Sequence, residues 1–291
     1  MSLFKDGRAR WAGGGVAIAL VALGVLGSAP ALAGIANTKH NLGSLSTGVN
    51  KFAGTAEICV FCHTPHGADT SAAVPLWNRV LAAPTTYQTY NSLGTSSLDG
   101  ATAPVGSVSL ACLSCHDGGQ ALNVMINQPG SGGFNTGLPF GTVIPGGNLT
   151  TDGKLGPSAT TISNLGTDLR NDHPIGIQYG GGMPGNIAYP SGPVADGAFR
   201  DADFRGAQWS NLNGNDVWWV DTPGTGAAGT REKTDMQLYT RLAGGTSPVP
   251  GATGNQALVE CASCHDPHSE NPTFLRVQNT NSAVCLACHI K

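Results

Sequence analysis

The stretch Cys59-Val60-Phe61-Cys62-His63 has the pattern Cys-x-x-Cys-His, which occurs four times in the chain. The other copies are Cys112-Leu113-Ser114-Cys115-His116, Cys261-Ala262-Ser263-Cys264-His265 and Cys285-Leu286-Ala287-Cys288-His289. Together the copies contain all 8 cysteines of the 291-residue chain. On one helical turn, cysteines three positions apart share a face, so both thiols can bond to one porphyrin while the next histidine binds its iron. The pattern is the attachment signature of haem c, and the sequence predicts four such haems.

Three other uses of cysteine do not fit this spacing. A disulfide framework does not require a histidine after every cysteine pair. A zinc site with two cysteines and two histidines usually has its histidines about three to five residues apart and well downstream. Thioredoxin-like Cys-x-x-Cys motifs come singly, inside an alternating strand and helix pattern that this sequence lacks. Haem attachment is therefore the preferred interpretation.

The chain has 8 histidines. Four haems with two axial imidazoles each would use all of them. Those inside the motifs are the predicted proximal ligands, His63, His116, His265 and His289. Those outside the motifs are the predicted distal ligands, His40, His66, His173 and His268. Methionine is the other common distal ligand, but Met125, Met183 and Met236 are too few for four irons. We therefore predict bis-histidine iron throughout, and no catalytic site.

Two distal candidates follow a motif at the same spacing, in the strings Cys62-His63-Thr64-Pro65-His66 and Cys264-His265-Asp266-Pro267-His268. Histidines so close in sequence cannot reach opposite faces of one porphyrin without wrapping around its edge. His66 and His268 are therefore each expected to bind a different haem from the neighbouring motif histidine. The order of ligands also repeats, once from His40 and once from His173. The sequence thus predicts two haem pairs in series, which form a chain of redox centres.

The N-terminus has the layout of a secretory signal peptide. Three basic residues precede an apolar run at 16–26, and small residues end the segment at 33. The apolar run is shorter than the roughly 20 residues that a membrane-spanning helix needs. We expect the mature protein to begin near Gly34 and to have no membrane span. Its expected place is extracellular or at the cell surface, with the periplasm as the alternative.

The charge pattern does not favour nucleic-acid binding. Loss of residues 1–33 removes 3 of the 15 basic residues and 1 of the 18 acidic ones, which leaves a formal net charge of −5. No cluster of lysine and arginine remains that could follow a phosphate backbone. We therefore expect no nucleic-acid partner.

Glycine and proline are abundant, with 42 Gly and 18 Pro in the chain, and only 6% of its residues are aromatic. Such a chain is rich in turns and poor in the large side chains that build a core. We expect a mostly irregular fold, with short helices and some β-strands wrapped around a haem stack. The expected segments are the signal peptide at 1–33, a first dihaem unit at 34–117, a Gly/Pro-rich spacer carrying His173 at 118–255, and the second pair of motifs at 256–291.

Two elements are expected inside the spacer. The run 216–220, with two adjacent tryptophans, predicts a strand. The string Thr234-Asp235-Met236-Gln237 looks like a capping box and predicts a helix over 234–242. The region 118–164 is dominated by turn-forming residues and predicts extended loops or short strands.

Several strings resemble the doubled-CXXCH multihaem cytochromes: Thr38-Lys39-His40-Asn41-Leu42, Cys59 to His66, Cys112 to Gly118, and Asn171-Asp172-His173-Pro174-Ile175-Gly176. Within that group, the haem number and ligand order are similar to those of OmcE-like tetrahaem cytochromes, which polymerise into extracellular nanowires. The resemblance covers the haem ligands but not the spacers at 118–170 and 180–255. It implies an electron-transfer protein that stacks end to end, with copies of itself, redox proteins and extracellular electron acceptors as partners.

Two other functions stay open at this stage. A monomeric periplasmic electron shuttle would use the same ligands. A multihaem reductase needs an open iron, which is not expected if all histidines are ligands, so we expect an electron carrier and not an enzyme. His40 also has two expected roles: it binds a haem of a neighbouring copy in a head-to-tail filament, or it binds the first haem of its own chain.

Overall fold

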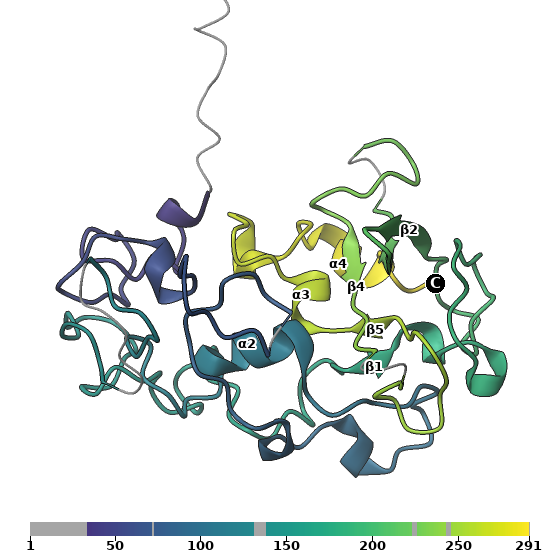
Figure 1. The fold of residues 1–291 in the computed structure, drawn as a ribbon, viewed down its shortest axis with the longest axis horizontal. Coiled ribbons are helices and arrows are strands. Elements are labelled where there is room, and N and C mark those ends of the chain that lie inside the picture. Colours follow the sequence, from purple (N-terminus) through teal and green to yellow (C-terminus); the bar gives the residue numbers. More distant parts are fainter. Residues whose placement is uncertain (1–33, 72, 131–137, 223–225, 243–245, 291) are drawn as a thin grey trace, which may run out of the picture. The chain divides into compact units, whose positions relative to one another are not determined.

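Regular secondary structure is sparse and is concentrated at the Cys-x-x-Cys-His motifs and in the spacer (Figure 1). The computed structural model describes residues 34–71, 73–130, 138–222, 226–242 and 246–290. The predicted signal peptide lies outside these residues. Gly34–Lys291 form one unit in the pattern of contacts.

Each motif forms a helical turn, as predicted. The turns are the 3₁₀-helix η2 (Cys59–Phe61) and the α-helices α2 (Ser107–His116), α3 (Cys261–Cys264) and α4 (Ala283–Leu286). In the first, third and fourth motifs the histidine N–H donates to the carbonyl of the first cysteine, at 2.8, 3.1 and 2.9 Å. This four-residue spacing is that of one α-helical turn, so the two cysteines of each motif lie on the same side.

Seven further 3₁₀ turns are described outside the motifs. They are η1 (Gly34–Asn37), η3 (Pro84–Thr86), η4 (Tyr90–Leu93), η5 (Tyr179–Gly181), η6 (Pro184–Asn186), η7 (Pro272–Phe274) and η8 (Thr280–Ser282). In the described part of the predicted loop region 118–164, no helix or strand occurs. The prediction of loops there is therefore confirmed.

Two small antiparallel sheets complete the fold. The larger has the order β2-β3-β4, made of Gln208–Leu212, Asn215–Val220 and Met236–Leu238. The smaller pairs β1 (Ile177–Gln178) with β5 (Leu258–Val259), just before α3. The β2–β3 turn is Asn213-Gly214, with φ of 53° and 83°, and such a pair is typical of a tight hairpin turn.

Of the two elements predicted in the spacer, one is confirmed and one is wrong. The strand expected over 216–220 is present as β3. The helix expected over 234–242 is wrong, because β4 pairs with β3 in register Trp218↔Leu238. Asp235, inside the expected capping box, instead accepts hydrogen bonds from the N–H groups of Thr222 and Glu232, at 3.0 and 2.6 Å. Pairing and burial of β4 outweigh the local capping preference.

The buried apolar residues gather around the motifs. One cluster contains Trp218 and Met236, with half-buried Cys264 and Cys288 packed against it. Another contains Phe52, Phe61 and Met125, with half-buried Cys62 and Cys115 packed against it. These two clusters thus pack against one cysteine of each motif.

Candidate haem-binding sites

The four motifs are neighbours in space in the order in which they follow one another in the chain. Cys62 of the first motif and Cys115 of the second pack against one apolar cluster. The thiol of Cys112, at the other end of the second motif, hydrogen-bonds that of Cys261 in the third. The third and fourth motifs meet in the other cluster through Cys264 and Cys288. Each motif therefore contacts the next.

Burial raises the pKa of several motif thiols. Burial, followed by nearby Cys115, raises the pKa of Cys62 to about 12. Burial and nearby Cys264 likewise raise the pKa of Cys288 to about 12. Thiols in such surroundings stay protonated and pack as small apolar groups. Their arrangement fits covalent attachment, in which the sulfur atoms carry no charge.

A buried acid fixes the second motif against the third. Glu260 precedes α3, is only 1% exposed, and accepts a hydrogen bond of 2.5 Å from the Ser109 hydroxyl of α2. The same hydroxyl accepts the Cys261 N–H at 3.1 Å, so α2 and α3 are joined (Figure 1). Arg241 pairs with Glu260 at 3.1 Å. Burial nevertheless raises the pKa of Glu260 to about 7.

Three motif histidines have their rings fixed by the backbone. His63, His116 and His265 each hydrogen-bond through Nδ1 to a carbonyl oxygen. The acceptors are Pro75, Ser163 and Thr273, at 2.8, 2.7 and 2.8 Å. A carbonyl can only accept, so Nδ1 carries the proton and Nε2 keeps its lone pair. Metal-binding histidines are commonly held in this way, so these rings fit iron coordination through Nε2.

Two pairs of imidazole rings lie at similar separations, with their planes 14° apart in one pair and 69° apart in the other. The ring centroids of His63 and His268 are 6.3 Å apart, and those of His40 and His116 are 6.1 Å apart. Two imidazoles that bind one metal from opposite sides have centroids about 6 Å apart, since each metal–nitrogen bond is about 2 Å and each centroid lies about 1 Å beyond its nitrogen. The separations therefore fit one iron between each pair.

His40 packs inside its own chain. Its Nδ1 lies 3.3 Å from the carbonyl of Pro267, and the ring of Phe274 stacks on it at 4.1 Å. Burial, followed by the nearby His116, lowers the pKa of His40 to about 4. Burial also lowers the pKa of His116. Both rings are therefore neutral at pH 7, which is the form that binds a metal.

The first and third motifs are held by the same pattern of backbone bonds. We call residues 59–64 with 75–78 the first clasp, and residues 261–266 with 273–276 the second clasp. In both, the carbonyl of the second cysteine accepts an N–H from the last residue of the opposite segment, and the N–H after the histidine donates back to that segment. The bonds are Asn78 to Cys62 and Thr64 to Leu76 at 2.9 and 2.8 Å, and Arg276 to Cys264 and Asp266 to Phe274 at 2.8 Å each.

The remaining predicted ligands are less closely grouped. His66 and His173 are exposed, and among the described residues neither ring packs against another ring. The fourth motif histidine, His289, packs against Phe204 at 4.4 Å. Met125 and Met236 are buried in the apolar clusters, where they serve as packing residues.

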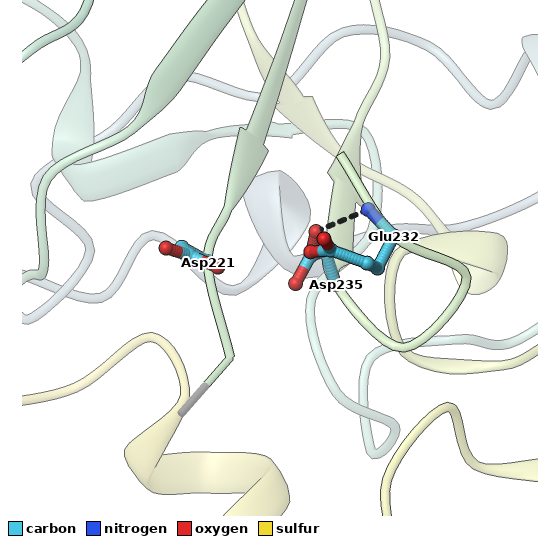
Figure 2. Close-up of side chains that lie close together, drawn as sticks. All are labelled: Asp221, Glu232 and Asp235. Atoms are coloured by element: carbon cyan, nitrogen blue, oxygen red, sulfur yellow. Dashed lines mark hydrogen bonds between the residues drawn. The ribbon is translucent and has the colours of Figure 1, made fainter. Parts of the chain in front are cut away.

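Three carboxylates outside the motifs lie close together beside the larger sheet. Ligand oxygens of Asp221, Glu232 and Asp235 are all within 4.8 Å of one another (Figure 2). Asp235 accepts the N–H of Glu232, and Asp221 accepts the N–H of Gly229 at 2.9 Å. Burial, and then Asp235, raises the pKa of Glu232. These carboxylates close the turn before β4, and we assign them no ligand.

Comparison with known proteins agrees with the motifs. Residues 253–291 match the family described as the doubled CXXCH motif. These residues bind haem c covalently, as in multihaem c-type cytochromes. The match covers the third and fourth motifs, and such paired motifs serve electron transfer. No curated protein matches the chain.

Two further features lie outside the family match or concern the whole described chain. Asn78, which no sequence pattern singled out, is fully buried and donates through Nδ2 to the carbonyl of Val60 at 2.6 Å and to that of Asn127 at 2.9 Å. It thus holds the first motif against a distant loop. In the part of the chain that the structure describes, no helix is long and apolar enough to cross a membrane.

Proposed function

We propose that the chain is an exported tetrahaem cytochrome c that transfers electrons through four covalently attached haems. The observation that carries the proposal is the two imidazole pairs, His63 with His268 and His40 with His116, each at the separation expected across one iron. Both pairs join a motif histidine to a histidine outside the motifs. Such a ligand set suits electron transfer, because neither axial position is left for a substrate.

The residues divide into three roles. The thioether residues are Cys59, Cys62, Cys112, Cys115, Cys261, Cys264, Cys285 and Cys288. The proximal ligands are His63, His116, His265 and His289. The distal ligands are His40, His66, His173 and His268. After these two pairs are assigned, His66 and His173 remain for the irons bound by His265 and His289.

The chain's own contribution is to hold and insulate these ligands. A bound haem c supplies reversible one-electron exchange between ferric and ferrous iron. The carbonyls of Pro75, Ser163 and Thr273 orient the motif imidazoles. The apolar clusters pack against four of the attachment cysteines, Cys62, Cys115, Cys264 and Cys288, and shield them in part from water. The contact of each motif with the next supports a relay of four centres and not a single redox site.

We further propose that copies of the chain stack head to tail into a filament that delivers electrons to redox partner proteins or extracellular acceptors. The resemblance to filament-forming tetrahaem cytochromes supports this. The position of His40 beside His116 supports a role inside its own chain, at the second motif rather than the first. A monomeric periplasmic shuttle is the alternative. Electron microscopy of the purified native protein separates them, because only the first forms filaments.

Intact mass under denaturing conditions tests the haem assignment. We expect the chain from about Gly34 plus four haems, with no free thiol. Fewer haems, or disulfides at these cysteines, would contradict the proposal. Carbon monoxide tests the ligands of the same sample, since bis-histidine iron should bind it slowly and incompletely. A rapid and complete change would reveal an open iron and favour a reductase.

A further inference from the structure

Arg79 is a buried cation at the junction of the first and second motifs. Its side chain is fully buried. It follows Asn78, whose N–H bonds the Cys62 carbonyl of the first motif. Its own guanidinium donates at 2.8 Å to the carbonyl of Ser114, which precedes Cys115 in the second motif. The charge therefore lies beside the attachment cysteines of both motifs.

The partners of this guanidinium are all neutral. They are the carbonyl oxygens of Ser114, Ala121, Leu122 and Val124 and the side-chain oxygen of Gln120, at 2.7 to 3.0 Å. In the described part of the chain, no carboxylate lies within ion-pair distance of Arg79. Arg241, at the junction of the second and third motifs, differs in this respect because it is paired with Glu260 at 3.1 Å.

A purely structural role would not need the charge. The Ser114 carbonyl belongs to the last turn of α2, where carbonyls lack helical partners and basic side chains often bond them. A neutral amide could donate some of the same bonds. Burying an arginine without a carboxylate is costly, because carbonyl dipoles replace only part of its hydration. The positive charge also acts strongly on its surroundings, since little water is present to screen it.

The charge lies near two attachment cysteines. Arg79 directly follows the residue bonded to the Cys62 carbonyl, and it donates to the carbonyl that precedes Cys115. Cys62 and Cys115 pack together against one apolar cluster. Both haems of this pair would therefore lie in the field of one buried cation.

We propose that Arg79 raises the reduction potential of the haems attached through Cys62 and Cys115 above that of the haem attached through Cys264. This rests on the proposed haem attachment. On reduction, each ferric haem gains one electron from the donor and no bond breaks, so the site becomes more negative by one charge. A nearby cation favours that change. At the third motif, above about pH 7, where Glu260 is ionised, its charge largely cancels that of Arg241.

Spectroelectrochemical titration of the haem-loaded protein tests the proposal, with an electrode as the electron donor. In Arg79→Gln, we expect two of the four midpoints to fall, each by about a tenfold change in the redox equilibrium, or about 59 mV for one electron. Arg79→Lys should keep most of the wild-type potentials, because it keeps the charge. Arg170→Gln, at an exposed ion pair with Asp168, should leave all midpoints in place. Unchanged midpoints in Arg79→Gln with four haems attached would overturn the proposal.

If Arg79→Gln does not fold with its haems attached, spectroelectrochemical titration of the wild type still tests the proposal. Salt screens exposed charges much more than buried ones. We expect two midpoints to lie above the others at both low and high salt. Loss of that separation at high salt, or no separation at all, would overturn the role of Arg79. Finding fewer than four haems by mass would instead contradict the proposed function.

Discussion

The first and second clasps hold a motif histidine with the same backbone bonds but with different side chains. In both, Nδ1 of the histidine bonds a carbonyl of the opposite segment, 12 residues away in the first clasp and 8 in the second. The residue after that carbonyl has a left-handed backbone in both, with φ of 56° at Leu76 and 59° at Phe274. The intervening loop differs in length, yet the ligand is held in the same way. The ring orientation therefore depends on the backbone.

The side chains connect each clasp to different neighbours. Asn78 and Arg276 occupy equivalent positions, and each donates to the carbonyl after the first cysteine, Val60 at 2.6 Å and Ala262 at 3.0 Å. Asn78 is fully buried, whereas Arg276 is half-buried. Leu76 is 52% exposed, whereas Phe274 stacks on His40. The first clasp is thus anchored in a core, and the second supports a further ligand.

Removing the equivalent side chains should have unequal effects. Asn78→Ala leaves the Val60 and Asn127 groups unpaired in the interior, so we expect a loss of about 4 kcal/mol in the free energy of unfolding. Arg276→Ala exposes its former partners to water and should cost about 1 kcal/mol. Denaturant titration of the haem-loaded protein measures both. Equal losses would contradict the difference between the clasps.

The stability of the second clasp should depend on pH, because the ionisable Glu260 precedes its first cysteine. The first clasp has the apolar Ile58 at the equivalent position. The pKa of Glu260 is raised from 4.5 to about 7 in the fold, so the folded state holds a proton that the unfolded chain releases. Its contribution to stability is full below pH 4.5 and is lost as the pH rises through about 7, amounting to about 3 kcal/mol. Glu260→Gln should remove this dependence. A variant with the wild-type pH profile would show that another group is responsible.

The Phe274 side chain should help to hold His40 as an iron ligand, whereas the equivalent Leu76 side chain should have no such role. Phe274→Ala removes the ring stacked on His40, which weakens its position by about 1 kcal/mol. Carbon monoxide should then bind about fivefold faster to one reduced iron, measured by flow spectroscopy. Leu76→Ala is the matched control and should bind at the wild-type rate. The same rate in both variants would contradict a role of Phe274 in holding His40.

The smallest change in stability is expected from glycine substitutions at Leu76 and Phe274, the two clasp residues with a left-handed backbone. Leu76→Gly relieves a backbone conformation that costs a branched residue about 1 to 2 kcal/mol and adds chain entropy to the unfolded state, for a net gain of about 0.5 kcal/mol. Phe274→Gly should be destabilising, because it also loses the contact with His40. Thermal unfolding of the two variants checks the opposite signs.

The sequence predicted the elements whose cause is local. The spacing of Cys59 to His63 requires one helical turn, and the turn is present. The aromatic run of β3 predicted a strand, and the strand is present. The helix expected over 234–242 failed because pairing with β3 is a long-range interaction that outweighs a four-residue capping pattern.

The clasps could not be predicted, because their bonds involve backbone groups. Pro75-Leu76-Trp77-Asn78 and Thr273-Phe274-Leu275-Arg276 share no residue type at any equivalent position. The buried position of Arg79 likewise had no pattern, since its acceptors are mostly carbonyls spread over residues 114–124. The sequence could count the histidines, but it could not show which rings pair with one another.

The pairing of ligands is the central claim, and carbon monoxide titration of distal variants tests it most directly. His40 and His268 lie outside the motifs and pair with different motif histidines, His116 and His63. We predict one open iron in His40→Ala, one in His268→Ala and two in the double variant, each with four haems attached. An unchanged count in either single variant, or one open iron in the double variant, would contradict the pairing.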